Sequence, residues 1–139
     1  MFQQLKFNVG DSTEFTTTFT AEKNKQFAEL SGDFNPVHFD ATRMAKTHFK
    51  KPIINGIFVT SSIGSAIVKL FVTDKTIVIA IEQHNSFLKP VYIGDTITAH
   101  VTIDDLLNDK GDLWVQAIVK NQNDQIVLSA RFRLRILET

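Results

Sequence analysis

The feature that most constrains the fold is a change in the spacing of apolar residues near the middle of the chain. Residues 52–68 carry no charge and are rich in small side chains, which predicts a buried helix over residues 57–71. Downstream, apolar and polar residues alternate over residues 96–103 and 126–136, as in strands that bury one face. One apolar helix followed by one-sided antiparallel strands predicts an α+β fold in which a sheet wraps around the helix.

Caps, turns and further apolar patterns predict the other elements. Thr20 is suited to cap a helix and Gly32 is suited to end it. Pro36 forces Asn35 out of the helical region, so residues 31–40 are predicted to form a shaped loop. The remaining expected elements are a strand at 13–19, helices at 21–30 and 41–47, a strand at 76–88 interrupted near 82–84, and a strand at 113–120.

The composition of the chain excludes several kinds of functional site and partner. The 139 residues predict one domain spanning residues 1–139, large enough to fold without a disulfide or a structural metal. The absence of cysteine excludes thiol nucleophiles, iron–sulfur clusters and cysteine-based zinc sites. Fifteen basic residues balance fifteen acidic ones, which argues against a nucleic-acid or membrane-surface binder.

The N-terminal residues suggest no export. Residues 1–7 lack the apolar core and cleavage site of a secretory signal, so we expect a cytoplasmic protein. The uncharged stretch at 52–68 is shorter than the roughly 20 apolar residues that a membrane span needs. We therefore expect no membrane partner.

The densest cluster of reactive side chains lies in the loop at residues 33–40. Asp33 and His38, five residues apart on a loop stiffened by Pro36, could converge on one water molecule as general base and general acid. Spacing alone favours the more ordinary roles, in which Asp33 caps a turn and His38 is a hydrogen-bonded loop residue. Asp40 is expected to cap the following helix.

A second candidate is Asn55-Gly56, at the start of the apolar helix. A helix N-terminus presents unpaired N–H groups and the positive end of the helix dipole, and Gly56 would allow a ligand to approach the backbone. Such a site can stabilise a developing oxyanion. The pair is also common as a simple turn and helix cap.

No cofactor or metal is expected. His48, His84 and His100 show no metal-ligand spacing, and the chain has no Walker-type phosphate loop and no Gly-x-Gly-x-x-Gly motif.

Alternate residues of the last strand form an arginine stripe, for which the usual role is a solvated or edge-protecting face. The stripe could also face the phosphates of a ligand. It consists of Arg131, Arg133 and Arg135.

Three sequence blocks together resemble the MaoC-like family of (R)-specific enoyl-CoA hydratases. The blocks follow one another in the same order and at the same spacings as in that family. The resemblance covers nearly the whole chain, and the first block is the most specific. The blocks are Phe27-Ala28-x-Leu30-Ser31-Gly32-Asp33-x-Asn35-Pro36-x-His38-x-Asp40, then Pro52-Ile53-Ile54-Asn55-Gly56, then Phe87-x-x-Pro90-Val91-x-x-Gly94-Asp95.

The resemblance implies a hot-dog fold, a homodimer or higher homo-oligomer, and an acyl-CoA substrate. Its catalytic Asp and His fall on Asp33 and His38, and its carbonyl-polarising amide falls on Gly56. These groups would add water to a trans-2-enoyl-CoA and form the (R)-3-hydroxyacyl product. Asn35 is expected to support the loop. We also expect Asn35, Asn55 and Ile57 to lie against the substrate.

Two departures accompany the resemblance. Most members have His-Gly where this chain has Asn55-Gly56, and a serine that supports the catalytic Asp in some members aligns with Gly64, next to Ser65. The alternatives are an acyl-carrier-protein dehydratase or acyl-CoA thioesterase on the same fold, or a non-catalytic acyl-CoA binding module. The Asn-Pro-x-His pairing argues against the thioesterase, and the intact Asp33 and His38 pair argues against loss of catalysis.

A neutral chain must supply local cations for the phosphates of coenzyme A. We expect a few Lys and Arg side chains near the mouth of the acyl tunnel. Lys89, beside Pro90, and the arginine stripe are the candidates.

Overall fold

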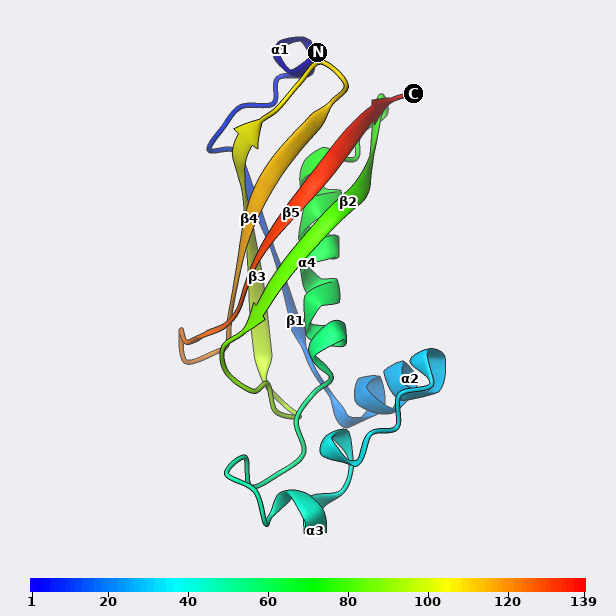
Figure 1. The fold of residues 1–139 in the computed structure, drawn as a ribbon, viewed down its shortest axis with the longest axis vertical. Helices are drawn as coiled ribbons and strands as arrows, with labels where there is room; N and C mark the ends of the chain where they lie inside the picture. The colour runs from blue at the N-terminus through cyan, green and yellow to red at the C-terminus, as the bar shows by residue number, and fades with distance from the viewer.

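A computed structural model describes all 139 residues as one antiparallel sheet with a long helix, α4 (Gly56–Phe71), along one face (Figure 1). The sheet order is β1-β3-β4-β5-β2, and every neighbouring pair is antiparallel. The predicted α+β fold, with a sheet around one helix, is confirmed. No helix is long and apolar enough to cross a membrane. The strands are β1 (Ser12–Thr18), β2 (Thr76–Phe87), β3 (Thr96–Leu106), β4 (Asp112–Lys120) and β5 (Ile126–Glu138).

The core lies between α4 and the sheet. On β3, Ile97, Ala99 and Val101 are fully buried while the intervening residues are partly or wholly exposed, as the alternating pattern predicts. Ile63 and Phe71 of α4 are also fully buried. Apolar side chains from one face of the sheet and one side of the helix therefore share a single core.

The segment between β1 and α4 projects at the end of the molecule opposite the two termini (Figure 1). Its first helix has the predicted ends: the Thr20 hydroxyl accepts a hydrogen bond from the Lys23 N–H, and Gly32 adopts φ 78°. The predicted helix at 41–47 is shorter and ends at Met44. Two short helices were not predicted, because a single turn has no apolar period. The helices here and at the N-terminus are α1 (Phe2–Leu5), α2 (Ala21–Ser31), the 3₁₀ helix η1 (Pro36–His38) and α3 (Ala41–Met44).

Two details expected of the strands are corrected by the structure. The predicted strand at 76–88 is present as β2, but the interruption expected near 82–84 is not: there is a bulge between Ala80 and Glu82, after which pairing with β5 resumes. β5 lies inside the sheet, between β4 and β2, so its arginine stripe protects no edge. The sheet edges are β1 and β2, and β2 pairs on one side only.

Candidate active site

The loop after α2 folds back through hydrogen bonds of its own side chains. The Asn35 N–H donates to Asp33 Oδ1 at 3.1 Å, and Asn35 Oδ1 accepts from the Val37 N–H at 3.1 Å. Pro36 starts η1, where its fixed φ suits the first turn. These contacts place Asp33 and His38 on the same side of the loop, with the Asp33 side chain 43% exposed and the His38 side chain 10% exposed.

The contacts of His38 fix its tautomer. Its Nδ1 lies 2.9 Å from the Ile53 carbonyl oxygen, which can only accept, so Nδ1 carries a proton and Nε2 of the neutral ring has a free lone pair. Asn24 Nδ2 donates to the His38 carbonyl oxygen at 3.0 Å and anchors the backbone. Nε2 faces Asp33 Oδ2 at 3.9 Å. This separation is too long for a hydrogen bond but allows one water molecule to contact both atoms.

Asn55 connects the loop to the start of α4. Its buried amide donates from Nδ2 to Asp33 Oδ2 at 2.8 Å, and its Oδ1 accepts from the Ile57 N–H at 2.9 Å. The second bond fixes which end of the amide is oxygen, so the NH₂ group must point at Asp33. Both Asp33 oxygens therefore accept an N–H, and these two bonds fix the orientation of the carboxyl group.

Gly56 is the first residue of α4, and its N–H has no hydrogen-bond acceptor within the chain. The helix dipole adds positive potential at this point. The ring of Phe87 packs so closely that a Cβ on residue 56 would lie 2.8 Å from it. Glycine therefore permits this approach. The free N–H follows Asn55, whose amide contacts Asp33, so it lies beside the Asp33–His38 dyad.

These groups share a cavity of about 710 Å³. Of the six predicted site residues, Asp33, His38, Asn55, Gly56 and Ile57 line it, whereas Asn35 does not and instead supports the turn. No group of three or more potential ligand side chains is placed to hold a metal ion. The other lining residues are His48, Phe49, Ile53, Ile54, Val59, Phe87, Leu88, Lys89, Pro90, Val91, Tyr92 and Val127.

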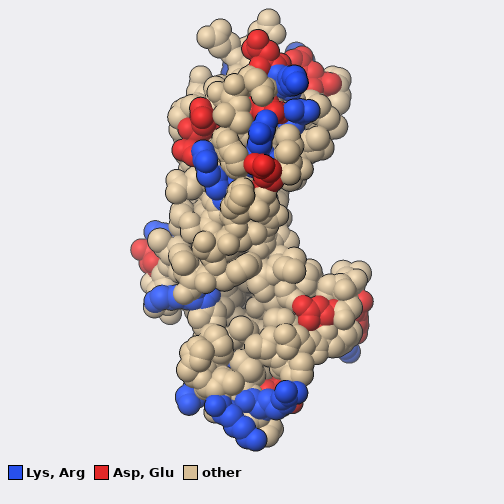
Figure 2. Space-filling model, in the orientation of Figure 1, with Lys and Arg blue, Asp and Glu red and all other residues tan.

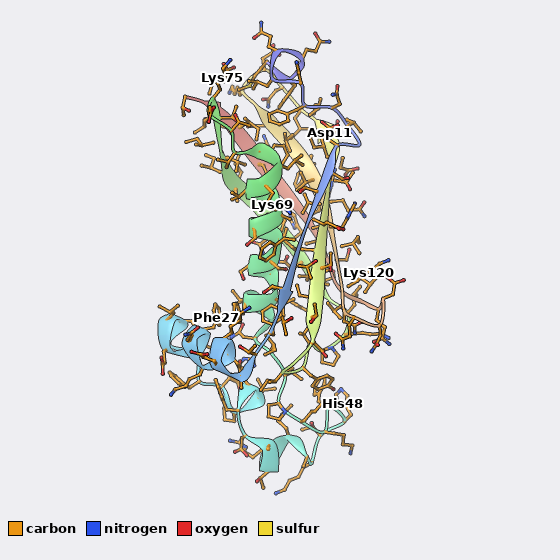
Figure 3. The ribbon with its side chains drawn as sticks, turned by 180° about the vertical axis from the view of Figure 1, so that it is seen from behind. Asp11, Phe27, His48, Lys69, Lys75 and Lys120 are labelled. Carbon is orange, nitrogen blue, oxygen red and sulfur yellow. The ribbon has the colours of Figure 1, made fainter.

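The sequence prediction missed several lining residues. His48 was considered only as a metal ligand, and nothing in its spacing indicates that its loop turns toward the cavity. Figure 3 places it at the end of the molecule opposite the termini. Phe87 lies in the third sequence block, which gave a signal, but no role followed from it. Tyr92 is positioned by its hydroxyl, which donates to the Phe49 carbonyl oxygen at 3.0 Å.

The expected cations divide into two groups. Lys89 lines the cavity. The arginine stripe does not, because its side chains pair with carboxylates elsewhere: Arg131 with Asp104, and both Arg133 and Arg135 with buried Asp112. Hydrogen bonds from Arg135 and then Arg133 hold the pKa of Asp112 far below its usual range.

Comparisons with known proteins show the family of the chain. A family model described as MaoC like domain matches residues 5–125. An (R)-specific enoyl-CoA hydratase from Aeromonas caviae is 34% identical over 102 residues, which are 73% of this chain and 75% of that protein. A mitochondrial 3-hydroxyacyl-[acyl-carrier-protein] dehydratase from Arabidopsis thaliana is 32% identical over 123 residues, or 86% of this chain and 72% of that protein.

The fold is shared as well. The solved structure of an A. caviae (R)-hydratase superposes with a TM-score of 0.83 at 28% identity, covering 93% of this chain and 96% of that one. The predicted hot-dog fold is thereby confirmed.

Proposed function

Since the chain belongs to the MaoC-like domain family, we propose that it adds water reversibly to a trans-2-enoyl-CoA and forms an (R)-3-hydroxyacyl-CoA. The observation that carries this proposal is the placement of Asp33 Oδ2 and His38 Nε2, 3.9 Å apart, in one cavity with the free N–H of Gly56. The hydratase and dehydratase names of the relatives support it.

The chemistry follows from the contacts. A water held between Asp33 and His38 loses a proton to the dyad as its oxygen bonds to C3 of the enoyl thioester. The electron pair of the C2=C3 bond moves to the thioester oxygen, where the Gly56 N–H and the helix dipole stabilise the enolate. The dyad then returns a proton to C2 from the same side. No cofactor is consumed, and dehydration is the same path reversed.

Steady-state hydration of crotonyl-CoA and trans-2-octenoyl-CoA tests the dyad. Asp33→Asn and His38→Ala should each lower kcat by about 10²–10⁴-fold, the usual contribution of a positioned acid or base. Asp124→Asn and His100→Ala are matched controls, because both residues are exposed and line no part of this cavity. No turnover by the unmodified protein would overturn the proposal, and full activity in both site variants would overturn the dyad.

A second candidate is the same reaction on a thioester held by an acyl carrier protein. The observation that favours it is a group of exposed lysines and an arginine beside the cavity, at residues 43–51. The A. thaliana dehydratase provides a precedent among the relatives.

A further inference from the structure

We propose that the basic surface formed by Arg43, Lys46, Lys50 and Lys51 docks an acidic carrier protein, which delivers its acyl thioester into the neighbouring cavity on a pantetheine arm. The inference rests on the proposed reaction at this site and takes up its second candidate substrate, a thioester held by an acyl carrier protein. It commits to an acidic protein as the occupant of this surface.

The charge of this surface is not neutralised by the chain itself. All four cations are exposed, and none forms an ion pair, whereas Lys25, Lys120 and the three arginines of β5 each have a carboxylate partner. The nearest acid in the sequence, Asp40, is occupied as the cap of α3 and accepts from the Arg43 N–H at 3.0 Å. In Figure 2, blue side chains gather with little red at the end of the molecule where α3 lies.

The basic surface continues to the cavity. Lys51 Nζ lies 4.5 Å from the ring centroid of Tyr92. The Tyr92 hydroxyl donates a hydrogen bond to the Phe49 carbonyl oxygen, and both aromatic residues line the cavity. Lys51 and Lys89 also line a smaller pocket that shares Lys89, Pro90 and Tyr92 with the cavity. Asp95 lines the same pocket, but its two oxygens accept hydrogen bonds from the Tyr92 N–H and from Gln122 Nε2. A phosphate at the start of a pantetheine arm would therefore meet two ammonium groups there.

The shape of the surface favours a protein over a small anion. Arg43, Lys46 and Lys50 lie outside both the cavity and the smaller pocket, on the projecting α3 segment (Figure 1). A coenzyme would be held in a hollow, whereas spread and unpaired cations on a projecting segment suit the acidic face of a macromolecule.

The test compares one acyl group on three carriers: crotonyl-N-acetylcysteamine, crotonyl-CoA and a crotonyl-loaded acidic acyl carrier protein. In Arg43→Glu/Lys46→Glu, kcat/KM for the carrier-protein substrate should fall at least about tenfold at 50 mM salt, because two attractive charges become repulsive. The values for the other two substrates should stay within about twofold. The loss should shrink at 300 mM salt, where screening is stronger.

The matched control is Lys75→Glu/Lys110→Glu, which reverses two charges away from the cavity. Figure 3 shows Lys75 at the opposite end from His48. An equal fall in kcat/KM for crotonyl-CoA and for the carrier-protein substrate would overturn the inference, because the surface would then bind the nucleotide of coenzyme A. An unchanged kcat/KM for the carrier-protein substrate would also overturn it. If the unmodified protein turned over none of the three substrates, the proposed function itself would be overturned. Thermal unfolding checks that each variant is folded.

Discussion

At the scale of single residues, Asn55 shows how this chain supports the carboxylate of Asp33. One amide caps α4 and donates to Asp33 Oδ2 at 2.8 Å. The serine that the family resemblance leads us to expect near Asp33 is replaced by Gly64, where a Cβ would meet no atom within 4 Å. We therefore propose Asn55 as a positioning residue that keeps one Asp33 oxygen turned toward His38.

Asn55→Asp should separate this positioning role from a purely structural one. The new carboxylate can still accept from the Ile57 N–H, but it cannot donate to Asp33 and it places a second negative charge beside it. We expect kcat to fall about 10–100-fold with little change in KM. The acidic limb of the kcat/KM profile should move to higher pH, because a neighbouring negative charge opposes proton loss.

The control for Asn55→Asp is Asn108→Asp, since Asn108 also caps a turn through its side-chain oxygen and donates to a carboxylate, that of Asp112, but lies outside the cavity and the smaller pocket. An unchanged pH profile in Asn55→Asp, with normal thermal unfolding, would contradict the positioning role.

At the scale of elements, the sequence predicted the helix ends and strands, which depend on residues close together in the chain. The ends of α2 follow from Thr20 and Gly32, and the strands follow from alternation. The sequence did not predict contacts between residues far apart in the chain. The Asn55–Asp33 hydrogen bond joins residues 22 apart, and the inner position of β5 depends on its pairing with β2. The site residues were found through the family resemblance, whereas spacing alone favoured ordinary roles for them.

The pairing of β4 with β5 includes a buried carboxylate with a definite pH dependence. Asp112 receives hydrogen bonds from Arg133 Nη2 at 2.8 Å and Arg135 Nη2 at 2.9 Å, which lower its pKa in the folded state. A lowered pKa stabilises the fold at pH values above about 4, the unfolded value, and this contribution is lost as the pH falls below it.

Asp112→Asn should therefore lower the Tm by several degrees between pH 5 and 8, because two guanidinium groups lose their counter-charge. The difference from the unmodified protein should shrink steadily below about pH 4. Calorimetry across pH 2.5–8 measures it, with exposed Asp109→Asn from the same turn as the control. A difference that stays constant down to pH 2.5 would contradict this account.

At the scale of the whole molecule, β2 is an uncovered edge. It pairs only with β5, and from Ala80 to Phe87 every residue is exposed. The middle of the face in Figure 2 carries few charged side chains. A long apolar strand at the edge of a sheet tends to pair with another chain, because its backbone N–H and C=O groups are unpaired. The exposed apolar residues of β2, of the adjoining α4 and of its C-cap are Ile57, Val68, Val72, Ile77, Ile79, Ile81 and Phe87.

We expect a second copy to cover this edge in an isologous dimer, with β2 strands pairing across the two-fold axis. Light scattering at micromolar concentration should then give about twice the chain mass of 15.7 kDa. Ile79→Glu/Ile81→Glu should give the monomer, because like charges would meet at the pairing edge. Ile126→Glu, an exposed apolar residue of β5, is the matched control and should remain dimeric.

Dimerisation should also affect the reaction, because Phe87 at the end of β2 and Leu88 after it line the cavity. In a dimer the partner would cover this part of the cavity and exclude water from the acyl chain. The monomeric variant should therefore show a KM for trans-2-octenoyl-CoA raised about tenfold, and a smaller rise for crotonyl-CoA, because burial of each additional CH₂ contributes roughly 0.8 kcal/mol. Equal KM changes for both chain lengths, or a monomeric unmodified protein, would show that β2 does not complete the acyl site.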